Sequence, residues 1–125
     1  MRDLLLVGTG GFIGSVTRYY LGGLVTRMTN APRFPVGTLT VNALGCLAIG
    51  LLAGLVERHH LFNAPTRLLL ITGLLGGFTT FSAFAYETLF LAREAKWLAA
   101  FANVGLQVGI GLLAVWIGYG LSRAG

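Results

Sequence analysis

Charge is scarce in this chain, because only 10% of its 125 residues are Asp, Glu, Lys or Arg, whereas about a quarter are charged in soluble globular domains. Four residues are acidic and nine are Lys or Arg, and the basic residues stand singly between apolar stretches. Nucleic-acid-binding proteins gather their basic residues into patches, so this distribution excludes nucleic acid as a partner. With 55% hydrophobic residues, the composition is that of an integral membrane protein.

Cysteine and the side-chain groupings of catalysis are also missing. Cys46 is the only cysteine, so an intrachain disulfide and a cysteine metal site are both excluded. Its place inside an apolar stretch is typical of a small buried hydrophobic residue. No nucleophile is accompanied by a base and an orienting group, so the sequence predicts that the protein is not an enzyme.

Four long apolar stretches are present instead, at about residues 4–26, 36–56, 67–92 and 97–121. Each is long enough to cross a hydrocarbon core of roughly 30 Å as a helix. The separators carry prolines and charges and leave no room for a soluble domain. We therefore expect residues 1–125 to form a single all-α membrane domain of four transmembrane helices.

The third stretch is interrupted near its middle by the run Gly-Gly-Phe-Thr-Thr at residues 76–80. Glycine loses the most backbone entropy in a helix and threonine hydroxyls compete for backbone partners, so this run predicts a break of the helix near mid-membrane. Backbone groups freed in lipid are costly unless they are buried in protein, hydrated or bound to an ion. The break is therefore expected to line a cavity or a site, and its carbonyl oxygens suit a hard cation such as sodium. A flexible kink packed on a neighbouring helix is the alternative.

Small residues and one arginine share a face of the first helix, because Gly10, Gly14, Arg18 and Gly22 are four apart. Small residues let membrane helices approach closely. An arginine facing lipid near the middle of a helix costs about 2.5–3.5 kcal/mol, so Arg18 is expected to face protein or water or to extend to the membrane surface. Two roles stay open for it: a functional charge, or an interfacial partner of Glu87, the only acid inside a spanning stretch.

Polar side chains also fall on single faces of the second and fourth helices. Thr38 and Asn42 are four apart, as are Asn103 and Gln107. An isolated asparagine in a membrane helix more often joins two helices by a hydrogen bond than binds a ligand. The stripe on the fourth helix must face either protein or an aqueous path.

Two phenylalanines follow the predicted break, and Phe81 and Phe84 share a helical face with Ser82 beside them. The edge of an aromatic ring is positive, so it attracts an anion without binding it as tightly as a full cation would. Amide and hydroxyl donors of Asn42, Ser82 and Thr38 would replace part of the hydration shell of a small anion. Ordinary packing of the two rings is the alternative explanation of their spacing.

Positive charge is divided equally between the two sides of the expected membrane domain. The basic residues are Arg2, Arg58, Arg67 and Arg123 on the side of the termini, and Arg27, Arg33, Arg93 and Lys96 on the other side. The excess of Lys and Arg that normally fixes orientation is therefore absent. We expect the chain to insert in both orientations and to form a dual-topology antiparallel homodimer.

Residues 76–84, Gly-Gly-Phe-Thr-Thr-Phe-Ser-Ala-Phe, resemble the third-helix signature of the CrcB/Fluc family of fluoride channels. Other pieces agree with that family in order and spacing: residues 11–14 with Arg18 and Tyr19, residues 34–42, and the glycine-rich fourth stretch. The resemblance covers the whole chain. It implies a channel in the cell inner membrane or plasma membrane that exports fluoride by passive electrodiffusion and so reduces its toxicity in the cytoplasm.

The resemblance also implies specific roles for residues. The anion pathways would lie at the interface of the antiparallel dimer and would include Asn42, Phe81, Phe84, Ser82 and Thr38.

Two further roles concern the backbone and the arginine. The backbone oxygens of Gly76 and Thr79 from both subunits would hold one structural sodium ion on the dimer axis, and Arg18 would be structural or would line a vestibule. The chain departs from the commoner family pattern at Ala83 and Ala85, where hydroxyl residues often follow the phenylalanines.

Two other function classes remain open at this point. A small multidrug-type transporter would also have about four short helices and dual topology, but such transporters resemble one another in a glutamate on the first helix, where this chain has Arg18 and no acid in the apolar stretch. A structural subunit of a larger membrane complex would have the same composition.

Overall fold

The computed structural model describes residues 1–30 and 34–125, and these are folded almost entirely into helices. The helices α1 (Arg2–Thr29) and α2 (Val36–His59) come first. Three short segments then follow one another without a gap, namely α3 (Ala64–Arg67), the π-helix η1 (Leu68–Leu75) and α4 (Gly76–Phe78). The helices α5 (Phe81–Arg93) and α6 (Trp97–Ala124) complete the chain. The prediction of an all-helical protein is confirmed for this part of the chain.

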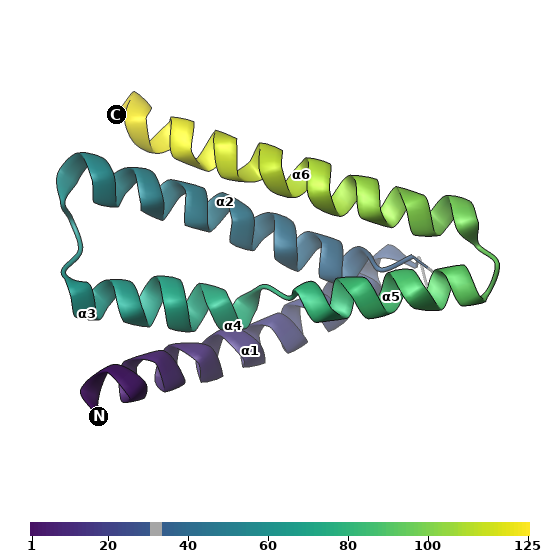
Figure 1. Cartoon of the computed structure of the whole chain (residues 1–125), viewed down its shortest axis with the longest axis horizontal. Helices are drawn as coiled ribbons and strands as arrows, with labels where there is room; N and C mark the ends of the chain where they lie inside the picture. The colour runs from purple at the N-terminus through teal and green to yellow at the C-terminus, as the bar shows by residue number, and fades with distance from the viewer. Residues whose placement is uncertain (31–33) are drawn as a thin grey trace.

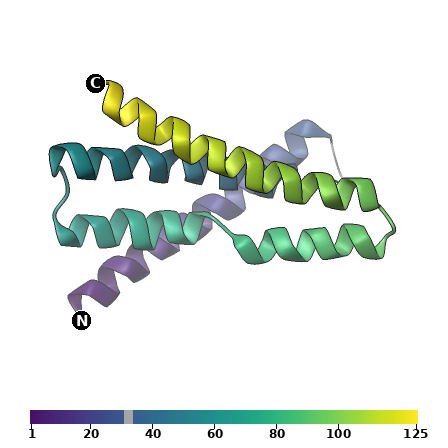
Figure 2. The ribbon, with the colours of Figure 1, turned by 45° about the horizontal axis from the view of Figure 1, so that its top comes forward.

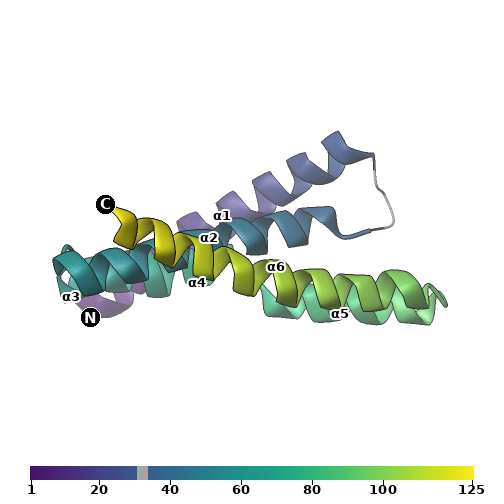
Figure 3. The ribbon, with the colours of Figure 1, turned by 90° about the horizontal axis from the view of Figure 1, so that it is seen from above.

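The long segments run back and forth, so that the two termini lie at the same end of the molecule (Figure 1). α6 lies along α2 in the most extensive helix contact of the fold, and α1 packs against η1, α4 and α2. α1 crosses the other segments at an angle (Figure 2). Seen from above, it diverges from α5 and α6 toward the end opposite the termini (Figure 3). η1 and α4 thereby lie between α1 and α2, whereas α5 packs mainly against α6.

Polar residues extend the helices beyond the expected ranges. α1 continues through Thr29 and ends at Asn30, which takes the left-handed conformation with φ 47°, and α2 continues to His59 and is capped in the same way by His60. The residues at these helix ends are hydrophilic, so the expected ranges, which were based on apolar residues, ended before them. Arg33, one of the basic residues in the charge count, lies outside the described residues.

Three segments of the described chain are long and apolar enough to cross a membrane. They are Val36–His59, Ala64–Arg93 and Trp97–Ala124. α1 is as long as α6, but it is not among them, and its composition includes charges at Arg18 and Arg27 within the helix. Length and composition thus support three spans directly.

The molecule has a small core and an apolar exterior. In the described part of the chain, the buried apolar side chains are Val41, Leu75, Leu91 and Ala100, whereas large apolar residues such as Phe101 and Trp116 are 73% exposed. Exposed apolar surface on this scale is unfavourable in water and is favourable against lipid chains. The distribution of side chains is therefore inverted with respect to a soluble helical bundle.

Glycines bring the helices together by close approach of their backbones. Gly10 and Gly14 of α1 are buried against the backbone of η1 and α4, as expected from their shared face. Gly50 of α2 and Gly118 of α6 serve the contact between those two helices in the same way. No described glycine has a positive φ, so their role here is to save space rather than to permit turns.

Gly50→Ala should destabilise the protein, because a Cβ atom at this position would lie 3.0 Å from the amide nitrogen of Tyr119 and against the carbonyl of Val115. Overpacking of this kind costs about 1–3 kcal/mol, and it would appear as a lower melting temperature of the protein in detergent. Gly120→Ala is the matched control, since a Cβ atom there meets nothing within 4 Å. Equal melting temperatures for the two variants would contradict the close packing of α2 on α6.

Candidate functional site

The helical path between α4 and α5 is interrupted at Thr79 and Thr80, which both take extended conformations with φ −85° and ψ 157° and with φ −149° and ψ 118°. The sequence placed the weakness at residues 76–80, but Gly76 and Gly77 remain helical in α4. Only the two threonines leave the helix. They are β-branched, which lowers helix propensity and suits extended backbone.

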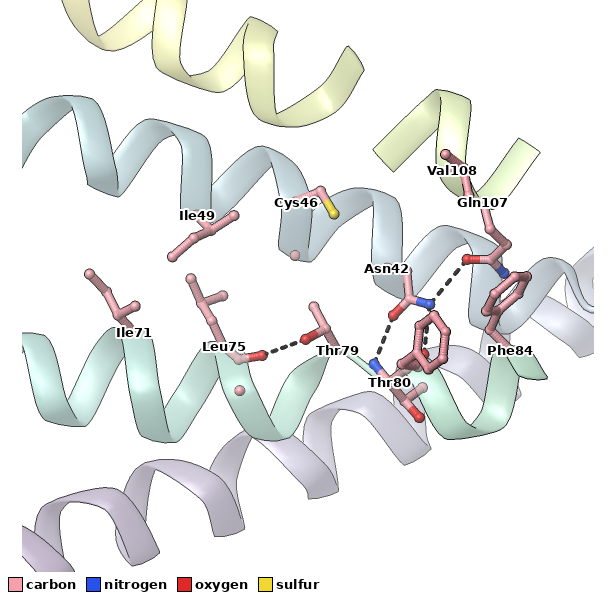
Figure 4. A pocket seen from close by; sticks show the side chains of 13 residues that line it. Asn42, Cys46, Ile49, Ile71, Leu75, Thr79, Thr80, Phe84, Gln107 and Val108 are labelled. Carbon is pink, nitrogen blue, oxygen red and sulfur yellow. Dashed lines mark hydrogen bonds between the residues drawn. The ribbon is translucent and has the colours of Figure 1, made fainter. Parts of the chain in front are cut away.

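Asn42 pairs with both backbone groups of Thr80. Its Oδ1 accepts a hydrogen bond from the amide nitrogen of Thr80 at 2.8 Å, and its Nδ2 donates to the carbonyl oxygen of the same residue at 2.9 Å. One side chain of α2 therefore replaces the pairing that a neighbouring strand would give to an extended residue (Figure 4). Burial of these two groups without partners would cost free energy comparable to lost hydrogen bonds.

The start of α5 is capped by the threonine that precedes it. Thr80 Oγ1 accepts from the amide nitrogen of Ala83 at 3.1 Å, the arrangement of a helix N-cap. Ser82 is exposed, and its hydroxyl lies 3.3 Å from Thr80 Oγ1. Ser82 is thus placed beside the interruption, with its hydroxyl on the outside of the single chain.

Two carbonyl oxygens at the interruption lose their usual helical donors. In a continuous helix Gly76 O would accept from the amide of Thr80, and Thr79 O would accept from the amide of Ala83. The first of these amides donates to Asn42 and the second to Thr80 Oγ1. The family resemblance implied a sodium ion at Gly76 and Thr79, and both residues line one cavity.

Arg18 is half-buried and faces protein. Its Nε donates to the carbonyl oxygen of Gly77 at 3.0 Å, and the hydroxyl of Ser15 lies 3.5 Å from the same oxygen. Glu87, the alternative partner, accepts instead from Thr38 Oγ1 at 2.7 Å. The structure therefore joins Arg18 to the backbone of α4 rather than to the carboxylate.

A cavity of about 440 Å³ lies at the interruption (Figure 4). Its lining joins α2, η1, α4, α5 and α6, and the site residues on it are Asn42, Gly76, Thr79, Phe81 and Phe84. The rings of Phe81 and Phe84 meet edge to face with their centroids 5.4 Å apart. Phe81 is 78% exposed in the single chain, so its ring borders the open side of the cavity.

Thr38 is separated from this cavity although it shares a helical face with Asn42. It lines a second cavity of about 490 Å³ together with Arg27 and Glu87. A third cavity, of about 140 Å³, is lined by Thr38, Arg18 and Thr80. The predicted polar residues therefore lie on two sides of the interruption, with Thr80 lining cavities on both.

Gln107 of α6 is a site residue that the sequence did not assign to the pathway. Its Oε1 accepts from Asn42 Nδ2 at 3.1 Å, and it lines the 440 Å³ cavity beside Phe84. Its Nε2 is buried without a hydrogen-bond partner among the described residues. The i, i+4 spacing of Asn103 and Gln107 marks this polar stripe in the sequence, but spacing does not reveal Asn42 as its partner. Asn103 instead donates to Thr88 Oγ1 at 2.9 Å.

Comparison with known proteins places the chain among membrane proteins of one family. The sequence profile of the family described as "CrcB-like protein, Camphor Resistance (CrcB)" matches residues 5–119. A protein of Methylobacillus flagellatus named "Fluoride-specific ion channel FluC" is 48% identical, over 98% of this chain and 96% of its own length. Proteins of the same name from Chloroflexus aurantiacus and Rhizobium etli are 46% and 45% identical. The former similarity covers 98% of this chain and 97% of the relative, and the latter 99% and 98%.

Arg18→Met should lower the melting temperature, because it removes the charged donor of Gly77 O, and a hydrogen bond to a charged group contributes about 1.5–3 kcal/mol. Arg27→Met removes the same charge from an exposed position of the same helix and should have a much smaller effect. The measurement is thermal unfolding of both variants in one detergent. Equal losses would show that Arg18 contributes only its charge.

Proposed function

Because the chain belongs to the CrcB-like family, we propose that it is a fluoride-specific channel of the bacterial plasma membrane that exports fluoride by passive electrodiffusion and so keeps cytoplasmic fluoride low. The observation that carries the proposal is the cavity at the interruption, where two aromatic rings and polar groups meet extended backbone. The names and near-complete coverage of the relatives supply the identity of the ion. Passage of an ion needs no chemical conversion, so the proposed role is transport rather than catalysis.

The proposed channel crosses the membrane four times and works as an antiparallel homodimer. The back-and-forth course of the long segments supports four spans with both termini on one side, with α1 as the least apolar span. The equal charge count supports insertion in both orientations. A second copy would also cover Phe81, whose ring is exposed at the edge of the cavity in a single chain.

The proposed anion path passes between the phenylalanine rings and the polar groups of α2 and α5. The edges of Phe81 and Phe84 would attract the anion without trapping it. Ser82 is exposed beside them, with its hydroxyl 3.3 Å from Thr80 Oγ1, whereas both N–H groups of Asn42 already have acceptors. An anion at Asn42 would therefore accept a hydrogen bond from an N–H group that now donates to Gln107 or to Thr80. Thr38 would serve the path from the second cavity.

A structural sodium ion is proposed at the carbonyl oxygens of Gly76 and Thr79. The fit rests on the diversion of the two amides that would otherwise reach these oxygens, which leaves hard oxygen donors at the edge of a cavity. Among the described residues no group of His, Cys, Asp and Glu side chains could hold a metal ion. A monovalent ion held by backbone oxygens of both subunits would bridge the dimer and neutralise the partial negative charge of the carbonyls.

Fluoride efflux from proteoliposomes tests the function. With valinomycin and a potassium gradient, the wild-type protein should release fluoride and hardly any chloride, without an imposed proton gradient. Phe81→Ile and Phe84→Ile should each slow release by about fivefold, since each removes an aromatic edge contribution of about 1 kcal/mol. Phe101→Ile, a matched change at an exposed position of α6 outside the cavity, should leave the rate unchanged.

The same assay contains the results that would overturn the proposal. Equal release of chloride and fluoride would contradict the proposed selectivity for fluoride. Release only under a proton gradient would indicate a coupled transporter of the small multidrug type. Protein prepared and reconstituted without sodium should release fluoride more slowly than protein kept in sodium. Unchanged release without sodium would exclude the proposed sodium site but would not contradict the proposed channel.

Labelling of the C-terminus tests the dual topology. In a Cys46→Ser, Gly125→Cys protein, a membrane-impermeant thiol reagent should label roughly half of the molecules in sealed cells, because no charge bias selects one orientation. Arg93→Gln with Lys96→Gln removes two positive charges from one side and should shift this fraction strongly. Complete labelling or complete protection of the unbiased protein would exclude the antiparallel dimer.

A further inference from the structure

Asn42 carries the hydrogen bonds that join α2 to the extended residue Thr80, and all donors of its side-chain amide are engaged. Oδ1 accepts from Thr80 N, and the two protons of Nδ2 serve Thr80 O and Gln107 Oε1. If the amide of Asn42 were turned over, a donor would face the Thr80 amide and an acceptor would face the Thr80 carbonyl. The hold on Thr80 thus depends on one orientation of this side chain.

Gln107 completes that orientation from α6. Without Gln107 Oε1, the second N–H of Asn42 would be left in a half-buried, mostly apolar cavity, where an unpaired donor is costly. Asn42 would then gain by turning toward another acceptor and would release one of its bonds to Thr80. The chain of contacts from Gln107 through Asn42 to Thr80 runs across three separate segments, as Figure 4 shows.

We infer that Gln107 is a positioning residue, which acts through Asn42 to hold Thr80 extended and so keeps the interruption between α4 and α5 open. Gln107 of α6 thereby influences the backbone conformation of Thr80 through Asn42, without a hydrogen bond of its own to Thr80. The importance of this control for anion passage rests on the proposed function, whereas the hold on Thr80 is a property of the fold alone.

Hydrogen exchange of the Thr80 amide reports this hold, because that amide donates to Asn42 rather than to a helix carbonyl. The measurement uses the full-length protein in lipid nanodiscs, with exchange followed at Thr80 by NMR. Gln107→Leu should speed exchange about five- to tenfold, the equivalent of one lost hydrogen bond. Gln107→Glu retains an acceptor oxygen and should restore slow exchange.

Asn103→Leu is the matched control, since it removes an amide from the same helix one turn earlier, where the partner is Thr88. It should leave exchange at Thr80 unchanged. The Asn42→Leu, Gln107→Leu double variant should exchange no faster than Asn42→Leu alone, because Gln107 acts through Asn42. Gln107→Met and Asn42→Ser replace the leucine variants if those do not fold.

Three results would overturn the inference: unchanged exchange in Gln107→Leu, failure of Gln107→Glu to restore it, or additive effects in the double variant. Fluoride efflux of the same proteins separates this inference from the proposed function. A wild-type protein that passes no fluoride would end the functional proposal and leave the exchange results valid. Fast exchange at Thr80 with undiminished efflux would confine the role of Gln107 to the fold.

Discussion

The backbone groups freed at Thr79 and Thr80 must find partners, and most of the site follows from this constraint. In an apolar surrounding an unpaired amide or carbonyl costs several kcal/mol, so an interruption survives only where other elements supply donors and acceptors. Here the partners are Asn42 for Thr80, the Thr80 hydroxyl for Ala83, and Arg18 for Gly77. α1 and α2 are therefore tied to the interruption by polar contacts, although their general packing is apolar.

The same hydrogen bonds determine which backbone carbonyl oxygens remain available to bind a cation. Amides diverted to Asn42 and to the Thr80 hydroxyl are withdrawn from Gly76 O and Thr79 O, so the proposed cation ligands arise from the way the neighbouring groups are satisfied. Close glycine contacts make this arrangement possible. α1 must lie near α4 for Arg18 to donate to the carbonyl oxygen of Gly77. Gly10 and Gly14 permit that approach along η1 and α4.

Apolar stretches and turn residues were enough to predict helices, their approximate ranges and the neighbourhood of the interruption. They were not enough to place it at the threonines, because local propensity counts Gly76 and Gly77 as the weakest helix formers. Gly77 packs against the backbone of Gly11 in α1, and Thr80 leaves the helix to pair with Asn42, 38 positions earlier. A partner so distant in sequence has no local signature. Gln107 was missed for the same reason, and Thr38 was grouped with Asn42 although its hydroxyl is bonded to Glu87.

The π-helical segment η1 also makes the length of this region critical. A π-turn holds one more residue than an α-turn, so the residues that follow it are rotated about the axis relative to a plain α-helix. That rotation sets which side of α4 faces α1, and with it the direction of the Gly77 carbonyl. Loops between helices commonly tolerate insertions and deletions. Removal of a single residue from Leu68–Leu75 would instead turn α4 away from Arg18 and displace both threonines from Asn42, so natural length variation among relatives should fall in the loops and spare this helix.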